Sequence, residues 1–69
     1  MWIIQTDING AKYWLQLQRN HVCLNGIIEN AVCYPLHSQA LDALRTYRNN
    51  FNTELQIVNR TSGKVLQAV

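Results

Sequence analysis

The chain has 69 residues, of which 48% are hydrophobic and only 14% are charged, and its formal net charge is +2. That length holds one small core, so we expect a single domain over residues 1–69. The hydrophobic fraction is too high for a disordered chain, and no apolar run reaches the about 20 residues of a membrane span. Amides replace the missing charges, with eight Asn and six Gln, and such a surface costs less to desolvate than a charged one.

Two runs near the start of the chain predict two strands. Residues 2–7 and residues 12–18 are rich in β-branched and aromatic side chains. Asn9 and Gly10 lie between them, and both residues accept the positive φ of a two-residue hairpin turn. We therefore expect the two strands to pair antiparallel.

The second strand has two different faces. Its apolar face is predicted to enter the core and consists of Tyr13, Leu15 and Leu17. Its other face consists of Trp14, Gln16 and Gln18. Alternation leaves three interpretations open for Trp14. It contacts a partner, it packs against glutamine side chains of its own sheet, or the two faces are reversed and it belongs to the core.

The region before the helix has a weaker pattern. Residues 19–26 interrupt the alternation and include a second Asn-Gly pair at 25–26. Residues 27–34 fit either a short helical turn or a third strand. We expect a turn over Ile28–Ala31 and then a short strand over Val32–Tyr34.

From residue 36 the apolar spacing changes to that of an amphipathic helix of about 13 residues, over 37–49. The residues that recur at this spacing are Leu36, Ala40, Leu44, Tyr47 and Phe51. Pro35 preorganises the helix start, and Ser38 is a candidate N-cap if the helix begins one turn later.

The last third of the chain returns to alternation. Residues 54–60 place Leu55 and Ile57 on one face, and residues 64–69 predict a returning edge strand. The predicted fold is α+β, an antiparallel sheet of four to five strands with one main helix packed on one face, in the order β-β-β-α-β-β.

No pattern of catalytic residues is present in the sequence. The four carboxylates are isolated from one another, and the three glycines lie in predicted turns outside any phosphate-binding motif. We expect no enzyme activity and no cofactor.

Two thiols and two imidazoles have the composition of a tetrahedral zinc site. They are His21, Cys23, Cys33 and His37. The short spacing from His21 to Cys23 is not usual for zinc, and the thiols also fit small buried hydrophobic residues or a Cys23–Cys33 disulfide. We expect no metal and reduced thiols, because the start of the chain lacks the features of a secretory signal and indicates a cytoplasmic protein.

The run "ENAVCYPLHSQALDALRTYRNNFNTELQIVNR" resembles the small β-β-α-β domains of phage and mobile-element accessory proteins. The positions that carry the resemblance are Ala31, Tyr34, Ala40, Leu44, Leu55 and Ile57. Members of this class include anti-CRISPR proteins and inhibitors of host polymerase, which dock on a host protein complex without catalysis. The resemblance implies a small inhibitor that acts in the host cytoplasm.

One helix covers one face of a sheet, so we expect the opposite face to stay open. That face would bind a host protein or a second copy in a twofold homodimer, through Trp14, Gln16, Gln18 and Gln56. A homo-oligomeric structural subunit is an alternative. Another is a nucleic-acid-binding regulator, whose contacts would be Arg19, Arg45, Arg48, Arg60 and Lys64. Because these cations are scattered, we expect nucleic-acid binding to be weak and nonspecific.

Overall fold

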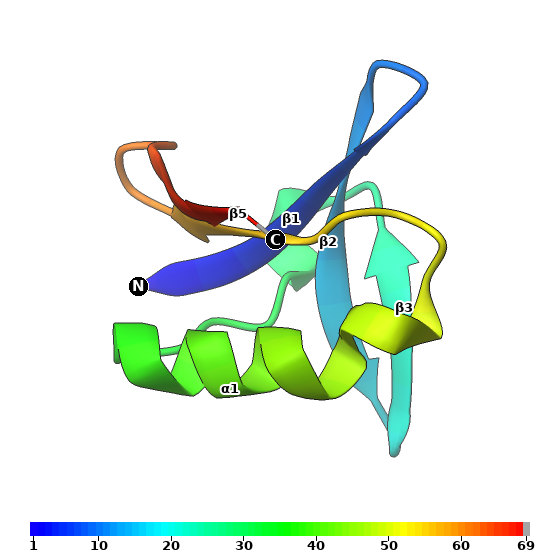
Figure 1. Ribbon diagram of the computed structural model, residues 1–69, viewed down its shortest axis with the longest axis horizontal. Helices are drawn as coiled ribbons and strands as arrows, with labels where there is room; N and C mark the ends of the chain where they lie inside the picture. Colours follow the sequence, from blue (N-terminus) through cyan, green and yellow to red (C-terminus); the bar gives the residue numbers. More distant parts are fainter. Residues whose placement is uncertain (69) are drawn as a thin grey trace.

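The computed structural model describes the backbone of residues 1–68 and the side chains of residues 1–64. The strands are β1 (Trp2–Ile8), β2 (Ala11–Gln18), β3 (His21–Asn25), β4 (Gln56–Asn59) and β5 (Val65–Ala68). The helices are α1 (His37–Tyr47) and the short 3-10 helices η1 (Ile28–Asn30) and η2 (Arg48–Asn50). The strands form one antiparallel sheet in the order β3-β2-β1-β4-β5, and α1 crosses one side of it (Figure 1). The α+β prediction is confirmed.

Two-residue turns connect the first three strands. Asn9 and Gly10 have φ values of 53° and 84° and join β1 to β2, as predicted. Arg19 and Asn20 have φ values of 48° and 67° and join β2 to β3. The prediction that residues 19–26 only interrupt the sheet is wrong, because a hairpin turns there. Arg rarely adopts a positive φ, so no turn signal marked this position.

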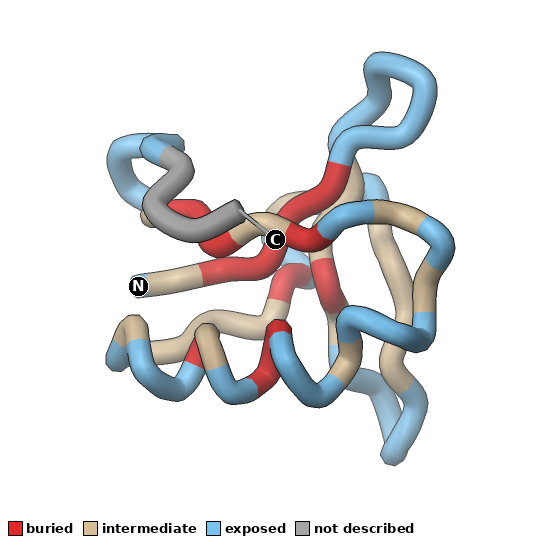
Figure 2. The backbone as a smooth tube through the Cα atoms, in the orientation of Figure 1, coloured by how far each residue is buried: buried red, intermediate tan, exposed pale blue. Residues whose placement is uncertain are grey.

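The main core lies between α1 and the sheet. It is a cluster of buried residues consisting of Ile4, Leu15, Ala40, Ala43, Leu44, Leu55 and Ile57. Ala40 and Leu44 of the predicted helix stripe are therefore in the core as expected, and Tyr47 and Phe51 pack against it. Three predicted core residues do not belong to the cluster. Leu17 is 46% exposed, Leu36 is 58% exposed, and Tyr13 is half-buried outside the cluster. The buried positions follow β1, the middle of β2 and the inner side of α1 (Figure 2).

The segment 27–34 crosses the side of the sheet opposite α1. Ile3, Ala31 and Val58 are buried there and form the second cluster, and Trp14 packs against it. The pairing of β1 with β2 runs from Ile8–Ala11 to Gln5–Trp14 and ends there. Past this last pair the two strands separate, and the segment 27–34 lies between them. Val32 N–H donates to the Leu15 carbonyl at 3.0 Å, and Tyr34 pairs with Trp2 through two 2.8 Å hydrogen bonds. The expectation that this face stays open is therefore wrong for the part that the segment covers.

Most predicted boundaries are close to the observed ones. The turn over Ile28–Ala31 is present as η1, whereas the strand predicted over Val32–Tyr34 is reduced to one bridge at Tyr34. The α-helix ends at Tyr47 and continues as η2. Leu36 is the N-cap residue in place of Ser38, and its N–H donates to Gln39 Oε1 at 3.3 Å. Residues 54 and 55 precede β4, and Val69 lies outside the described residues.

Candidate protein-binding groove

Two adjoining hollows lie on the same side of the sheet as α1, and Asn50 lines both of them. We call them together the helix-side groove. The first has a volume of about 610 Å³ and is lined by Asp7, Ile8, Asn9, Leu24, Asn50, Phe51, Asn52 and Thr53. The second has a volume of about 430 Å³ and is lined by Leu17, Asn20, Val22, Tyr47 and Asn50.

The groove exists because α1 is short. Its 11 residues span about 16 Å and pack mainly on β1 and β4. The helix-side surface of the β2–β3 hairpin is therefore only partly covered. Leu17 is 46% exposed and Ile8 is 37% exposed, although both belong to strands. Part of the uncovered apolar surface is thus on the side of the helix, at Ile8 and Leu17.

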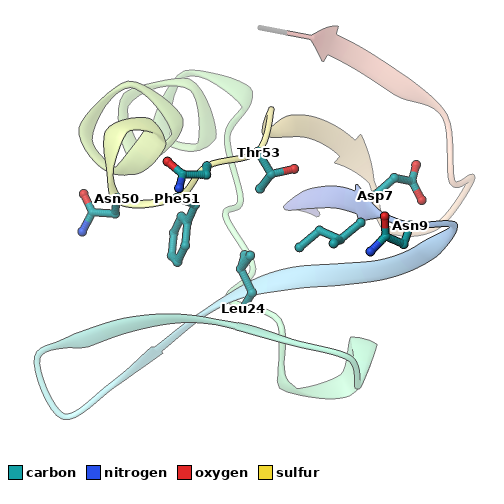
Figure 3. Close-up of a pocket in the computed structure, with 8 residues that line it drawn as sticks. Asp7, Asn9, Leu24, Asn50, Phe51 and Thr53 are labelled. Carbon is teal, nitrogen blue, oxygen red and sulfur yellow. The ribbon is translucent and has the colours of Figure 1, made fainter.

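Apolar side chains from two elements meet in the first hollow. Phe51 comes from the loop after η2 and Leu24 from β3, and the two side chains point toward one another (Figure 3). Both are half-buried and pack against the main core. The first hollow therefore has an anchored apolar surface.

A buried hydroxyl holds the loop that forms one wall. Thr6 Oγ1 is fully buried, donates to the Glu54 carbonyl at 2.7 Å and lies 2.6 Å from Thr53 Oγ1. Because Thr6 has one proton to donate, Thr53 donates in the second bond. These two bonds connect residues 53 and 54 to the centre of β1, so the wall is positioned by the core.

The rim of the groove is polar, and most of its polar groups are uncharged. Asn9, Asn50 and Asn52 supply amides around the first hollow, and Asp7 is the one carboxylate among the residues that line it. Asp7 lies 3.7 Å from Lys12 Nζ, and both side chains are more than half exposed. Such a pair contributes little to stability. The groove therefore offers amide donors and acceptors beside apolar surface.

The binding residues predicted on the face opposite α1 differ in how far they are buried. Trp14 is half-buried, and its Nε1–H donates to Gln5 Oε1 at 3.1 Å. Gln18 is exposed, whereas Gln16 and Gln56 are half-buried. Gln56 and Trp14 flank Gln5 on neighbouring strands, and Gln16 Oε1 is buried without a hydrogen-bond partner among the described atoms. Because the indole N–H is used within the sheet, Trp14 presents less to a partner than alternation predicts.

The basic residues of the nucleic-acid alternative are not gathered on one surface. Arg19 lies in the β2–β3 turn, and Arg60 and Lys64 lie in the region between β4 and β5, at the other side of the molecule (Figure 1). Arg45 and Arg48 are exposed at the end of α1. The fold brings Arg45 near Arg48 along the chain but does not bring Arg19 together with Arg60 and Lys64.

The four candidate zinc ligands lie in three parts of the fold, which are β3, the segment before α1 and the start of α1. The His37 ring meets the edge of Trp2 with ring centroids 5.2 Å apart, and Cys33 packs against the second cluster. His21 and Cys23 belong to β3, and both cysteines are free and half-buried. Within the described part of the chain, no three His, Cys, Asp or Glu residues gather closely enough to hold a metal ion.

Comparison with protein-family models, with curated proteins and with solved structures gave no match to this chain. None of the helices in the described part of the chain has the length and apolar character that a membrane span needs. The candidate site therefore depends on the geometry alone.

The sequence analysis did not find the groove. Leu17 was predicted to be core, and Phe51 was assigned to the helix stripe. The signal that could have found the groove is the helix length, because 11 residues cannot cover five strands.

Proposed function

We propose that the chain is a small non-catalytic regulator or inhibitor that works in the cytoplasm by docking on another protein through the helix-side groove. The observation that supports this proposal is the combination of the exposed side chains of Ile8 and Leu17 with a rim rich in amides, in two adjoining hollows. Protein interfaces have this composition, with an apolar centre, few charges and polar groups at the edge.

The shape of the groove favours a protein segment as its occupant. The two hollows adjoin at Asn50, so an elongated occupant can place one apolar side chain beside Phe51 and another beside Leu17. Asparagine side chains each have donors and acceptors, and they can pair with the backbone of such a segment. Apolar side chains of the partner would then cover the apolar surface that α1 leaves exposed, and the burial of both surfaces would favour binding.

The charge of the groove favours protein over nucleic acid. Binding of a phosphate backbone requires Lys or Arg, and none of the residues that line the two hollows is basic. Asp7 would repel phosphates at the end of the first hollow. The resemblance of the sequence to phage and mobile-element accessory proteins supports a host protein complex as the partner.

A capture experiment with a matched pair of variants tests the proposal. Tagged wild-type protein, Ile8→Glu and Ile27→Glu are each used to capture proteins from lysate of the source cell, with and without nuclease treatment. Ile8 lines the groove and is 37% exposed, whereas Ile27 is 54% exposed and does not line it. Both variants place the same carboxylate at an exposed isoleucine, and only Ile8 lines the groove.

We expect a protein that wild type and Ile27→Glu retain and that Ile8→Glu loses. Titration calorimetry with that protein, once purified, should show at least a tenfold weaker affinity for Ile8→Glu, which corresponds to about 1.4 kcal/mol. Equal retention of the same proteins by both variants would refute the groove as the binding site. Retention that disappears on nuclease treatment would favour the nucleic-acid alternative.

A further inference from the structure

The strand β3 is an edge of the sheet without the Lys, Pro or bulge that often prevents edge pairing. It is hydrogen-bonded to β2 on one side and is the last strand in the order. Natural edge strands are protected by Lys, Pro or a bulge. The residues His21–Asn25 include neither Lys nor Pro, and their register with β2 has no shift.

The hydrogen-bonding groups that point away from β2 belong to Val22 and Leu24. The β2–β3 turn has two residues with positive φ, and a turn of this type closes on a hydrogen-bonded pair, which is Gln18 with His21. Pairs then alternate along an antiparallel ladder, so Val22 and Leu24 lie at non-hydrogen-bonded positions. Their N–H and carbonyl groups therefore face the free edge.

A second observation supports this assignment. Leu15 is opposite Leu24, and the Leu15 carbonyl accepts a hydrogen bond from Val32 N–H on the far side of β2. Leu15 therefore directs its backbone groups away from Leu24. Among the described residues, no hydrogen bond to the backbone of Val22 or Leu24 is found outside the sheet pairing.

We propose that two copies of the chain pair through β3 as an antiparallel twofold dimer centred on Cys23. This inference does not depend on the proposed function, because it rests on the free backbone groups of β3. The side chains of Leu24 and Val22 also line the first and the second hollow. The dimer would join two five-stranded sheets into one continuous sheet.

The register follows from the free backbone groups. Antiparallel pairing of β3 with itself aligns all five of its residues only when Cys23 is opposite Cys23 of the second copy. Val22 is then opposite Leu24 of the second copy at hydrogen-bonded positions. Each of these two symmetric pairs exchanges two hydrogen bonds, so every outward group of Val22 and Leu24 is satisfied.

The side chains also favour a second copy as the occupant. Val22 and Leu24 lie on the same face as Leu17, so twofold pairing brings apolar residues of the two copies together on the helix side. Twofold symmetry requires only one self-complementary patch. The strand has no Asp, Glu, Lys or Arg, so its pairing with itself places no like charges opposite one another.

Cys23 provides a direct readout of the register. At the twofold axis the two cysteines would occupy a non-hydrogen-bonded pair, where the Cα atoms are about 4.5 Å apart. That distance lies within the range of about 4.4–6.8 Å for disulfides. An added oxidant would take two electrons from the pair of thiols, each thiol would lose a proton, and one S–S bond would form between the copies.

The experiment combines sedimentation equilibrium with oxidative cross-linking. Under reducing conditions we expect wild type to be a dimer. With copper-phenanthroline and dioxygen as oxidant, we expect a covalent dimer from wild type and from Cys33→Ser, and none from Cys23→Ser. A monomer at every concentration, or a reduced dimer that cross-links equally well in Cys23→Ser, would overturn the proposal.

A pair of edge variants separates backbone pairing from apolar contact. Val22→Pro removes an N–H that points outward, and proline is tolerated at such edge positions. Val22→Ala removes apolar surface and keeps the N–H. We expect Val22→Pro to raise the dimer dissociation constant at least tenfold above that of Val22→Ala. A folded Val22→Pro that dimerises as Val22→Ala does would refute the pairing, and if Val22→Pro does not fold, the Cys23 cross-link decides.

Discussion

The hydrogen bond between Trp14 and Gln5 determines whether Trp14 belongs to the fold or is free for a partner. Gln5 is 8% exposed, and its Oε1 accepts from Trp14 Nε1 at 3.1 Å. Trp14→Phe keeps an aromatic ring against the second cluster but removes the only donor of the indole. The buried acceptor of Gln5 then has no partner, and we expect the free energy of unfolding to fall by about 1–3 kcal/mol.

That loss is large for a chain of this size. At about 0.05–0.15 kcal/mol per residue, the whole domain has a free energy of unfolding of about 3–10 kcal/mol. Each 1 kcal/mol corresponds to a melting-temperature shift of about 4–8 °C in a domain of 60–100 residues. Trp14→Phe should therefore melt well below wild type, and urea titration followed by far-UV circular dichroism measures the difference.

A double-mutant cycle isolates the hydrogen bond from the smaller ring. Gln5→Leu removes the acceptor, and the pair Trp14→Phe with Gln5→Leu should show a coupling of about 0.5–1.5 kcal/mol. The control cycle combines Trp14→Phe with Gln18→Leu, since Gln18 is exposed, and should give no coupling. A coupling of zero between Trp14 and Gln5 would refute the reasoning. It would indicate that the indole N–H is available to a partner.

Three further predictions test the packing, a titrating group and a turn. Leu44→Ala, at a fully buried position, should lower the free energy of unfolding in urea by about 2–5 kcal/mol. Leu17→Ala should lower it far less, because Leu17 is 46% exposed, and equal losses would contradict the conclusion that α1 leaves this end of the sheet uncovered. Burial, with a smaller contribution from Tyr47, raises the pKa of Tyr34 above 10.0, so the folded chain keeps this proton after the unfolded chain has lost it. Stability from this group is present below pH 10.0 and falls as the pH rises through the folded pKa, and Tyr34→Phe should show a weaker decline in urea titrations at increasing pH. Arg19→Gly should raise the free energy of unfolding by about 1 kcal/mol, because Arg19 has a φ of 48° that glycine adopts without strain; an unchanged or lower melting temperature would show that the turn is not strained.

Local patterns in the sequence determined the types of most elements and the faces of the strands. Leu15 and Trp14 were assigned to opposite faces by alternation, and they belong to the two different clusters. The helix was found from its apolar spacing, and the first hairpin from Asn9 and Gly10. These features depend on neighbouring residues only, since a strand alternates and a helix repeats whatever it packs against.

Only the tertiary structure decided which faces are covered. Leu15 and Leu17 have the same place in the pattern, yet Leu15 is fully buried and Leu17 is 46% exposed. The difference arises because α1 packs on β1 and β4 and ends before it covers the β2–β3 hairpin. Coverage depends on the length and position of distant elements, and alternation contains no information about either.

The crossing segment and β3 show the same limit. Residues 27–34 enter the gap between β1 and β2 and cover the face that the sequence left open, which places Trp14 at the edge of a cluster. Pairing of β3 with β2 holds Arg19 at a positive φ that its own preference disfavours. In both cases contacts between segments outweigh the local preference, because burial and a complete hydrogen-bond ladder stabilise the chain more than one strained residue costs.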